Sequence, residues 1–416
     1  MGIMIDTKAF IVDGNESDSE QRNEEEKVGL EKIRNINAED FFIKKSFGIY
    51  LLVYRYEQEL KNLSQKTMSY ENVRSLVEKY APKLWTKAKS AVQRGSYDDR
   101  PLYWARIKME VALKNHLKGK LDADIENLIQ LFEEKSRNYT GINFSKNIDN
   151  STNGKPKKKI LITGFDPFGL DVNKEQSNPS GAVALALHGT EFSDEDGNIG
   201  EIQAMIFPVR YEDFDSSKNS TAGMGEGVVE KYIRPLFDEV DMIVTISQSL
   251  PECYHIDTFA TATRGGSSDN KGYTRPEGTK SVSTDAPETL PTTLPSSLIN
   301  GKVIYYGKYF LTGSEYILFK GVLDNSPHNC SKENIQTGYI YYGPGGNYLS
   351  NEIFYRVSLL RENWIAAQLP NVVTKPTGHF HVAMLQETSD ALFDWQKTKY
   401  LVDIVRNSLI FSLRDI

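Results

Sequence analysis

Cysteine is scarce in this sequence: Cys253 and Cys330 are the only two among 416 residues. Two thiols cannot build the disulfide framework of a small secreted domain or a four-cysteine zinc site. We expect both to be reduced, with one disulfide between them as the alternative. The six histidines also lack the spacing of metal ligands. The sequence therefore predicts no metal site.

Long apolar runs are missing as well. No window approaches the roughly 20 apolar residues that a membrane-spanning helix needs. The first residues, Met1–Lys8, lack the basic head and the apolar run of a secretory signal. We therefore expect a cytoplasmic protein with no membrane partner, and secretion stays open if a signal peptide has been removed.

Neither sign of charge dominates, since 49 Lys and Arg residues stand against 56 Asp and Glu residues, a net charge of −7. Without a basic excess, nucleic acid is not expected as a partner. The glycine-rich turn at 343–346 lacks the Lys-Ser/Thr pair of a phosphate loop, and Gly265-Gly266 lacks the strand and helix of a dinucleotide site. No nucleotide or other cofactor is therefore predicted.

The first part of the chain divides by composition into three segments. Residues 1–37 form an acidic, polar arm that we expect to be largely disordered, with a helix only toward its end. Residues 38–139 show helical periodicity, and residues 140–157 have the Asn, Gly and Lys content of a linker. The helices are expected at about 39–63, at 70–93, from Pro101 onward and at 121–136. Their short joints predict a small bundle, which could cap a site or mediate homo-oligomer formation.

From residue 158 the pattern alternates between strands and helices. Apolar strands are expected at Ile160–Thr163, Glu201–Pro208 and Met242–Ser247, with helices at Pro179–Leu187 and Gly225–Phe237. Such alternation predicts an α/β fold whose parallel sheet is covered on both faces.

The rest of the chain completes this order. The stretch from Ser247 to Leu298 is too long for an ordinary connection, so we expect a functional loop or an insertion. A hairpin is predicted at Val303–Phe319, a last strand at Gly378–Met384 and a closing helix at Ser389–Leu413.

A strand-like segment, a glycine turn and a helix head follow one another in Tyr341–Tyr355. Ser350 lies where the helix is predicted to begin, close to unpaired backbone N–H groups and the positive end of the helix dipole. Such a place favours an anion, including a developing oxyanion. The simpler interpretation is that Ser350 only caps the helix, because serine is a preferred N-cap residue.

A series of short motifs gives these elements a common context. They are Thr163-Gly-Phe-Asp-Pro-Phe-Gly169 with Ser177-Asn-Pro-Ser180, Phe207–Tyr211, Ile246–Gln248, Thr293–Pro295, Gly346–Asn351 and Gly378–Val382. In content and order they resemble the pyroglutamyl peptidase I (pyrrolidone-carboxylate peptidase) family. The resemblance covers residues 158–416. It implies a three-layer α/β/α domain with a mixed, mostly parallel sheet, preceded here by an all-α region, and an enzyme that removes an N-terminal 5-oxoproline.

The family's catalytic triad of Cys, His and an acid is carried over position by position. Ser350 falls on the nucleophile, where the family has Cys, and His381 falls on the base. Asp257 falls on the orienting carboxylate, where the family usually has Glu. The alternative for His381 is a core histidine, while His379 is expected to be structural or on the surface.

The resemblance also implies a set of substrate contacts. Phe165 and Phe168 would lie against the pyroglutamyl ring, with polar contacts from Gln248. Core packing is the alternative for the two phenylalanines. Arg264 corresponds to the family's arginine near the nucleophile, although its spacing from the carboxylate is three residues short.

Serine in place of cysteine changes the reacting atom. A cysteine near a histidine and a helix head can be held as a thiolate, whereas a serine hydroxyl needs the histidine to take its proton during attack. Ser-His-Asp is a working hydrolase arrangement on several folds. We therefore consider a serine-dependent amide hydrolase acting on pyroglutamyl or related acyl groups, an inactive relative that binds cyclised N-termini or a protein partner, and a cysteine peptidase whose nucleophile was replaced by engineering.

Overall fold

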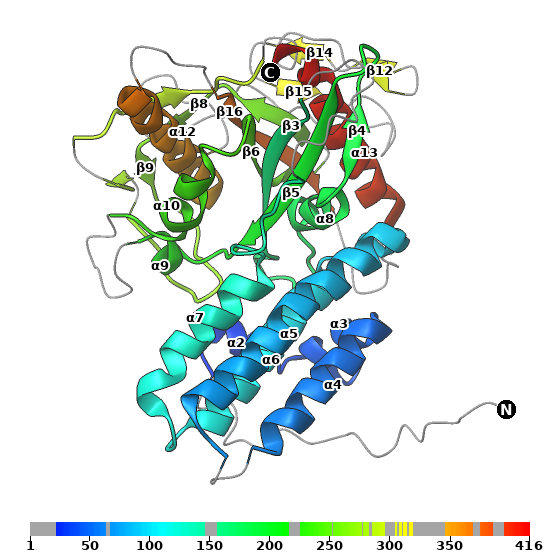
Figure 1. The fold of residues 1–416 in the computed structure, drawn as a ribbon, viewed down its shortest axis with the longest axis vertical. Helices are drawn as coiled ribbons and strands as arrows, with labels where there is room; N and C mark the ends of the chain where they lie inside the picture. The colour runs from blue at the N-terminus through cyan, green and yellow to red at the C-terminus, as the bar shows by residue number, and fades with distance from the viewer. Residues whose placement is uncertain are drawn as a thin grey trace, which may run out of the picture.

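A bundle of helices joined to a layered α/β part makes up the computed structural model of the chain (Figure 1). The structure describes residues 22–416 except 64–66, 146–155, 216–224, 252, 277, 283–284, 296–303, 306–307, 310, 314–315, 319–345, 369–374 and 386–394. Within these described ranges, no helix combines the length and apolarity needed to cross a bilayer.

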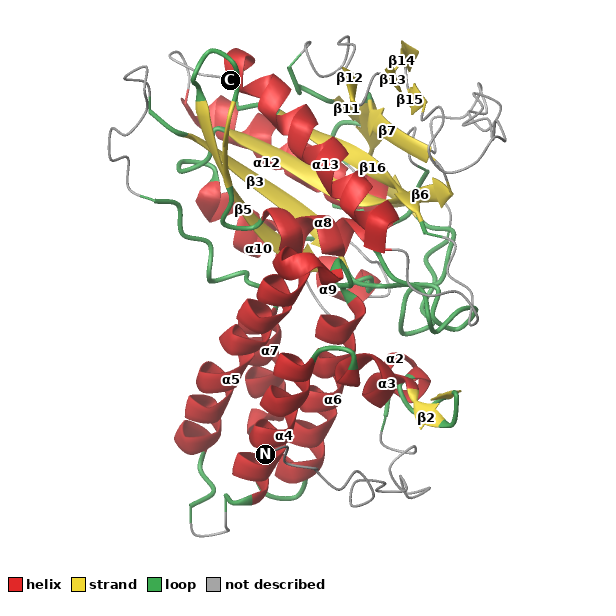
Figure 2. Cartoon of the chain, turned by 90° about the vertical axis from the view of Figure 1, so that its right-hand side faces the viewer, coloured by secondary structure: helices red, strands yellow, loops and turns green. Residues whose placement is uncertain are grey.

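Four long helices form the bundle and pack side by side below the sheet (Figures 1 and 2). The helix predicted at 39–63 is divided in two, α3 and α4. Pro82 lies inside α5 without ending it, because Ala81 and Leu84 beside it are buried in the core and this packing offsets the lost hydrogen bond. The helices of this part are α2 (Glu24–Val28), α3 (Ala38–Lys44), α4 (Phe47–Lys61), α5 (Tyr70–Ala91), α6 (Arg100–Leu117) and α7 (Ile125–Ser136).

Residues 22–37, the end of the predicted acidic arm, are folded against the bundle. Asn23 caps α2 through a capping box with Glu26, and a short hairpin of β1 (Lys32–Ile33) and β2 (Ile36–Asn37) follows. Glu25 and Glu26 are buried. These two side chains are therefore partners in buried polar contacts, whereas Glu24 and Glu31 of the same segment are exposed.

An eight-stranded mixed sheet forms the centre of the second part, in the order β14-β15-β7-β16-β6-β3-β5-β4. Its four central strands, β16, β6, β3 and β5, run parallel, and antiparallel strands extend both edges. The strands of this sheet are β3 (Lys158–Phe165), β4 (Glu191–Ser193), β5 (Ile199–Phe207), β6 (Met242–Pro251), β7 (Cys253–Asp257), β14 (Leu311–Gly313), β15 (Tyr316–Leu318) and β16 (Thr377–Met384).

Helices cover both faces of the sheet, which confirms the predicted α/β fold with a helical region before it. On one face α8 packs against β3, β5 and β6, with α13 beside it; α10 and α12 lie on the other face (Figure 1). The helices are α8 (Pro179–Leu187), α9 (Tyr211–Phe214), α10 (Val228–Ile233), α12 (Leu349–Gln368) and α13 (Trp395–Ser412).

The long segment after Ser247 is more regular than the sequence suggests. β6 continues to Pro251, and β7 joins the main sheet antiparallel to β16. Short strands then make small two-stranded ladders outside the main sheet. These strands are β8 (Phe259–Thr261), β9 (Thr263–Arg264), β10 (Thr279–Lys280), β11 (Thr289–Pro291), β12 (Ile304–Tyr305) and β13 (Lys308–Tyr309). The segment from Ser247 to Leu298 is therefore not a single loop, because residues 255–257 pair with β16 and residues 253–254 pair with β15.

The bundle and the α/β part share a hydrophobic core. Buried Trp85 and Val92 from the bundle belong to the same apolar cluster as Val183 and Leu187 of α8. Gln93 adds a hydrogen bond from its Nε2 to the backbone oxygen of His188, at 2.9 Å. The two parts are therefore packed against each other directly.

Candidate active site

The loop between β3 and α8 is built by its own motif residues. A side chain at Gly164 would place its Cβ 2.4 Å from the backbone oxygen of Ser180, so only glycine lets the end of β3 approach α8 this closely. Asn178 caps α8 by accepting a hydrogen bond from the Ser180 N–H at 3.1 Å, and Pro179 takes the first helical position. The Asn178 Nδ2 also donates to the backbone oxygen of Asp166 at 2.9 Å. The loop is thereby closed on itself at the carboxyl end of β3.

Ser350 lies in the first turn of α12, one residue inside the helix. The Glu352 N–H donates to the Tyr348 oxygen at 3.1 Å, which makes Tyr348 the capping residue. Gly346 before it has φ +93°, a left-handed conformation that suits glycine. The glycine turn at 343–345 lies outside the described residues. Helix geometry leaves the N–H groups of this first turn without intrahelical acceptors, so the Ser350 hydroxyl stands among backbone donors.

Asn351 fixes the head of α12 in place. Its Nδ2 donates to the backbone oxygens of Thr261 and Thr263, both at 3.0 Å, and its Oδ1 accepts from the Thr261 N–H at 2.9 Å. The Asn351 side chain thus makes the hydrogen bonds to the backbone of β8 and β9 that a neighbouring strand would otherwise make. This bonding sets the position of the neighbouring Ser350.

A small cavity joins Ser350 to three of the predicted substrate contacts. Its volume is about 30 Å³. Ligand sites commonly measure about 300–1,000 Å³, so even a small acyl group would enter only if the walls of this cavity move apart. None of the residues that line it is charged. They are Phe165, Phe168, Asn178, Val209, Ser247, Gln248, Tyr348, Leu349 and Ser350.

Aromatic rings and one amide give the cavity its character. Phe165 is 3% exposed and stacks on Phe214, so it packs in the core and also reaches the cavity. Phe168 is half-buried, with its ring 6.1 Å from that of Tyr348. Gln248 is 9% exposed, and its Oε1 has no hydrogen-bond partner among the described residues. A buried acceptor without a donor costs free energy, so a ligand with an N–H group would complete it.

His381 and Asp257 form a buried pair on adjacent antiparallel strands. The Nδ1 of His381 lies 3.3 Å from the Asp257 Oδ1, and both side chains are no more than 3% exposed. The sheet creates this contact, because β16 and β7 pair with His379 opposite Asp257. On its other side His381 is paired in register with Ser247 of β6, which lines the cavity.

His379 has a structural place beside this pair. Its Nδ1 lies 2.7 Å from the Thr245 Oγ1 and its Nε2 lies 2.6 Å from the Ser247 Oγ. Asp257, His379 and His381 are the one group of potential metal ligands found within the described ranges, with atoms within 4.8 Å of one another. A metal there would have to displace the hydroxyl contacts of His379, so the arrangement suits a hydrogen-bonded pair better than a ligand set.

Arg264 is placed away from the cavity. It is fully buried, it is ion-paired with Asp215, and its Nε lies 3.5 Å from a carboxylate oxygen of Glu352. Glu352 in turn binds Arg356 at 2.8 Å. The structure therefore brings together Ser350, Phe165, Phe168 and Gln248 in one group and His381 with Asp257 in another, and it gives Arg264 contacts that hold α12.

Sequence reasoning missed several residues that line the cavity: Asn178, Val209, Ser247, Tyr348 and Leu349. All five lie within motifs that carried the resemblance. The signal was their position at the carboxyl ends of parallel strands, where sites form in open α/β sheets.

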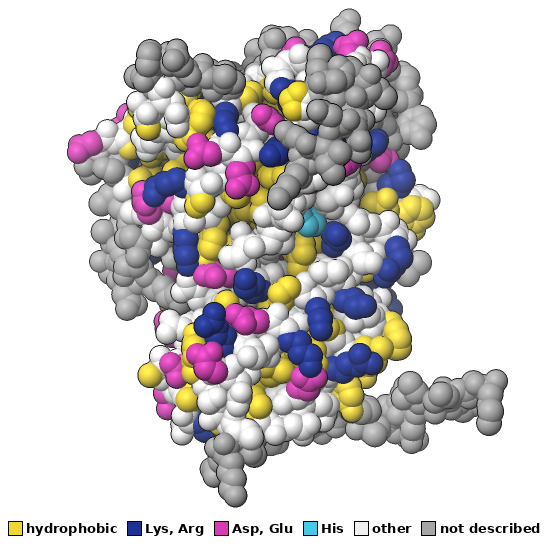
Figure 3. All heavy atoms as spheres, in the orientation of Figure 1, with side chains coloured by type: hydrophobic (Ala, Val, Ile, Leu, Met, Phe, Trp, Pro, Cys, Tyr) yellow, Lys and Arg dark blue, Asp and Glu magenta, His cyan; other side chains and the backbone are white. Residues whose placement is uncertain are grey.

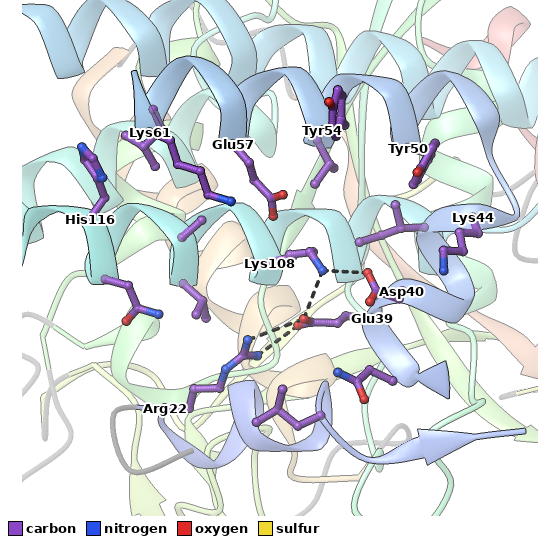
Figure 4. A pocket seen from close by; sticks show the side chains of 18 residues that line it. Arg22, Glu39, Asp40, Lys44, Tyr50, Tyr54, Glu57, Lys61, Lys108 and His116 are labelled. Carbon is purple, nitrogen blue, oxygen red and sulfur yellow. Dashed lines mark hydrogen bonds and ion pairs between the residues drawn. The ribbon is translucent and has the colours of Figure 1, made fainter. Parts of the chain in front are cut away.

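A larger cavity lies entirely within the helical part, between α3, α4 and α6 (Figure 4). Four of its charged groups are paired: Glu39 binds Arg22 at 3.0 Å, and Asp40 binds Lys108 at 2.7 Å. It contains none of the predicted site residues. Size alone therefore does not make it the better candidate.

Comparison with known families matches two segments of the chain in order. Residues 17–133 match the family model described as the PA0049 N-terminal domain, and residues 159–300 match the PA0049 C-terminal domain. The uncharacterized protein PA0049 of Pseudomonas aeruginosa is 32% identical over 224 residues. That match covers 49% of this chain and 38% of the relative, so the chain spans less than half of the relative's length.

Two solved structures are similar to the α/β part at low identity. A mutant pyrrolidone carboxyl peptidase of the hyperthermophile Pyrococcus furiosus is 17% identical, with 62% of this chain and 99% of that chain covered and a TM-score of 0.36. Pyroglutamyl peptidase I of Bacillus amyloliquefaciens is 16% identical, with 62% and 98% covered and a TM-score of 0.38.

Proposed function

We propose that this protein hydrolyses the amide bond after an N-terminal pyroglutamyl group, or after a similarly small neutral acyl group, with Ser350 as nucleophile. The observation that carries the proposal is the buried contact of 3.3 Å between His381 and Asp257 next to a cavity that holds Ser350. Nucleophilic acyl transfer requires a base that is oriented by a carboxylate and can reach a nucleophilic hydroxyl. Here His381 is connected to the cavity through its pairing with Ser247.

The roles of the three side chains follow from their contacts. Asp257 faces the Nδ1 of His381, which leaves the Nε2 to take the Ser350 proton as the hydroxyl oxygen attacks the carbonyl carbon. The backbone N–H groups of the first turn of α12 would stabilise the resulting oxyanion. His381 then returns the proton to the leaving amine, and the acyl group stays on Ser350 as an ester. Water, deprotonated by His381, attacks this ester and restores the hydroxyl.

The cavity favours an uncharged, compact acyl group. Its lining has no ion to pair with a charged substrate, and burying an unpaired charge there would be costly. The unpartnered Oε1 of Gln248 can accept a hydrogen bond from a lactam N–H. Phe165 and Phe168 offer flat apolar surface to the same ring.

The direct experiment is release of a fluorophore from a pyroglutamyl amide by the wild-type protein, Ser350→Ala and Ser350→Cys. We expect hydrolysis by the wild type and a loss of at least about a thousandfold in kcat for Ser350→Ala, because the nucleophile of a triad acts as part of a unit. Circular dichroism should show that the alanine variant is folded, since its backbone environment is unchanged.

The remaining outcomes identify the alternatives. Turnover only by Ser350→Cys would point to a cysteine-dependent ancestor of the site. No turnover by any of the three, with saturable binding of a pyroglutamyl peptide by isothermal titration calorimetry, would contradict the proposal and favour a binding protein.

A further inference from the structure

A buried carboxylate links the cavity loop to the helical bundle. Asp166 lies between Phe165 and Phe168, and it is 2% exposed. The Arg106 guanidinium of α6 donates to its two oxygens at 2.8 and 3.1 Å, and Arg137, just after α7, donates to it at 2.6 Å. Both arginine side chains are at most 1% exposed. The residue flanked by the two cavity phenylalanines is therefore held from outside the α/β part.

The bundle also holds the other end of this loop. Asp99, just before α6, accepts a hydrogen bond from the backbone N–H of Asn178 at 3.0 Å, and Asn178 lines the cavity. Arg100 donates to the backbone oxygen of Glu175 at 2.6 Å. The loop from 166 to 178 thus has bundle contacts at both of its ends.

We propose that Arg106 and Arg137 are positioning residues that, through Asp166, hold Phe165 and Phe168 in the conformation that walls the cavity. The helical part is then a component of the substrate site rather than a separate module. The consequence for turnover depends on the proposed function, whereas the positioning of the loop does not.

The physical basis is the demand that a buried carboxylate makes on its surroundings. A carboxylate out of water needs both charge compensation and directed donors, and a guanidinium supplies them in a fixed plane. The Arg106 Nε also contacts the Ser136 Oγ at 3.2 Å, which orients the plane. Burial alone would lower the pKa of Arg137, but Asp166 and Glu133 beside it hold that pKa well above its usual value, so it stays charged. A lysine could supply the charge but not the second donor, the Nε of Arg106 that contacts Ser136.

Backbone hydrogen–deuterium exchange tests the positioning directly. In Arg106→Gln we expect the amides of residues 166–178 to exchange roughly tenfold faster or more, because the loop opens more often. In Arg106→Lys the exchange rate of these amides should lie between that of Arg106→Gln and that of the wild type. The lysine variant replaces Arg106→Gln in the test if the glutamine variant fails to fold. Gln93→Ala is the matched control, since it removes another contact between bundle and α/β part, at His188, without touching the loop. Unchanged exchange in a folded Arg106 variant would overturn the proposal.

Steady-state kinetics test what the positioning does for the site. For Arg106→Gln we expect KM to rise roughly tenfold with kcat within about twofold, since the cavity wall moves and the triad does not. In an Asp166→Asn background, Arg106→Gln should add little, because both changes break the same contact. If Arg106→Gln raised KM equally in the wild-type and Asp166→Asn backgrounds, Arg106 would not act through Asp166. If the wild type lacks turnover while exchange responds as described, the proposed reaction fails and the positioning role stands.

Discussion

The β3–α8 loop contributes to two regions: Phe165 and Phe168 line the cavity at Ser350, and Asp166 belongs to the junction between the bundle and the α/β part. These two regions differ in chemistry. The cavity is lined by aromatic, apolar and neutral polar side chains. The junction is rich in buried charge. Arg137 pairs with both Asp166 and Glu133, and Glu133 also pairs with Arg210. On the face shown in Figure 3, basic side chains gather over the helices in the lower half. In this molecule, buried ion pairs hold the two parts together, whereas the lining of the cavity carries no charged side chain.

This difference has a physical reason. Ion pairs at the junction satisfy one another, and their buried geometry fixes how the loop lies. A reacting carbonyl instead needs groups that change charge only during the reaction, which a neutral serine and histidine provide. Glu25 illustrates the junction: burial raises its pKa, while Arg210 opposes that shift. Changes in the cavity should therefore alter turnover, and changes at the junction should alter stability and loop position.

The largest effect on turnover, apart from loss of the nucleophile, is expected for Asp257→Asn. An asparagine would keep the shape but could hold His381 in the wrong tautomer, so kcat should fall by about 10³- to 10⁴-fold. The KM for a pyroglutamyl amide should change little, because Asp257 does not line the cavity. Steady-state kinetics over a range of substrate concentrations separate the two parameters.

Treatment with a chelator distinguishes a triad from a metal site. Treatment of the wild type with a strong chelator should leave its rate unchanged, because Asp257 is assigned to His381 rather than to an ion. Loss of activity on chelation, restored by a divalent cation, would instead assign Asp257, His379 and His381 to a metal.

Gln248→Met should have an intermediate effect, confined to the substrate. Methionine keeps the length of the side chain but cannot accept the lactam N–H, so kcat/KM should fall about 5- to 100-fold, corresponding to roughly 1–3 kcal/mol. Thermal unfolding should show no loss of stability, since the change removes a buried oxygen that has no partner in the described structure. A loss of stability with unchanged kcat/KM would place Gln248 in the fold and not in the site.

His188→Gln should affect turnover least and the pH dependence of stability most. Burial, with Lys89 adding to it, lowers the pKa of His188 to about 4, and its Nδ1 accepts a hydrogen bond from the Ala204 N–H at 3.0 Å. Between pH of about 6.5 and 4, the unfolded chain binds a proton there that the folded protein does not. The free energy of unfolding should therefore decrease as pH falls through this window, by up to about 3 kcal/mol.

Urea unfolding of wild type and His188→Gln at pH values across that window provides the measurement. The variant should show a flatter decline than the wild type. Parallel declines in the two proteins would mean that His188 titrates as it does in the unfolded chain, and that other groups at the junction set the acid sensitivity.

The periodicity of apolar residues predicted the fold class. It could not predict the features that depend on contacts between segments distant in the sequence. Pro179–Leu187 was predicted to the residue because Asn178 and Pro179 are local signals for a helix start. β4 and β7 were missed because they have only three and five residues, too few for a clear alternation of apolar and polar side chains. The folded segment at 22–37 was hidden by its acidic composition, since Arg210 and Lys114, the partners of the buried Glu25 and Glu26, lie elsewhere in the chain.

The site residues likewise fall into those that local motifs predicted and those that depend on contacts across the fold. Motifs identified Ser350, Phe165, Phe168 and Gln248, which the fold brings to one cavity. Arg264 could not be placed by spacing, because its ion pair with Asp215 depends on a contact across the fold. Asp166 lies inside one of the motifs, but its role depends on Arg106 and Arg137 of the bundle. These partners are 60 and 29 residues away in the sequence, so no local pattern predicts them.

The most direct test of the central claim is to trap the acyl group. The wild-type protein is mixed with a pyroglutamyl ester, quenched in acid during turnover and digested, and the modified peptide is located by mass spectrometry. A pyroglutamyl ester on Ser350, absent from Ser350→Ala, is the predicted result. Turnover by Ser350→Ala at the wild-type rate, or an adduct on another residue that accounts for turnover, would contradict the assignment of Ser350 as nucleophile.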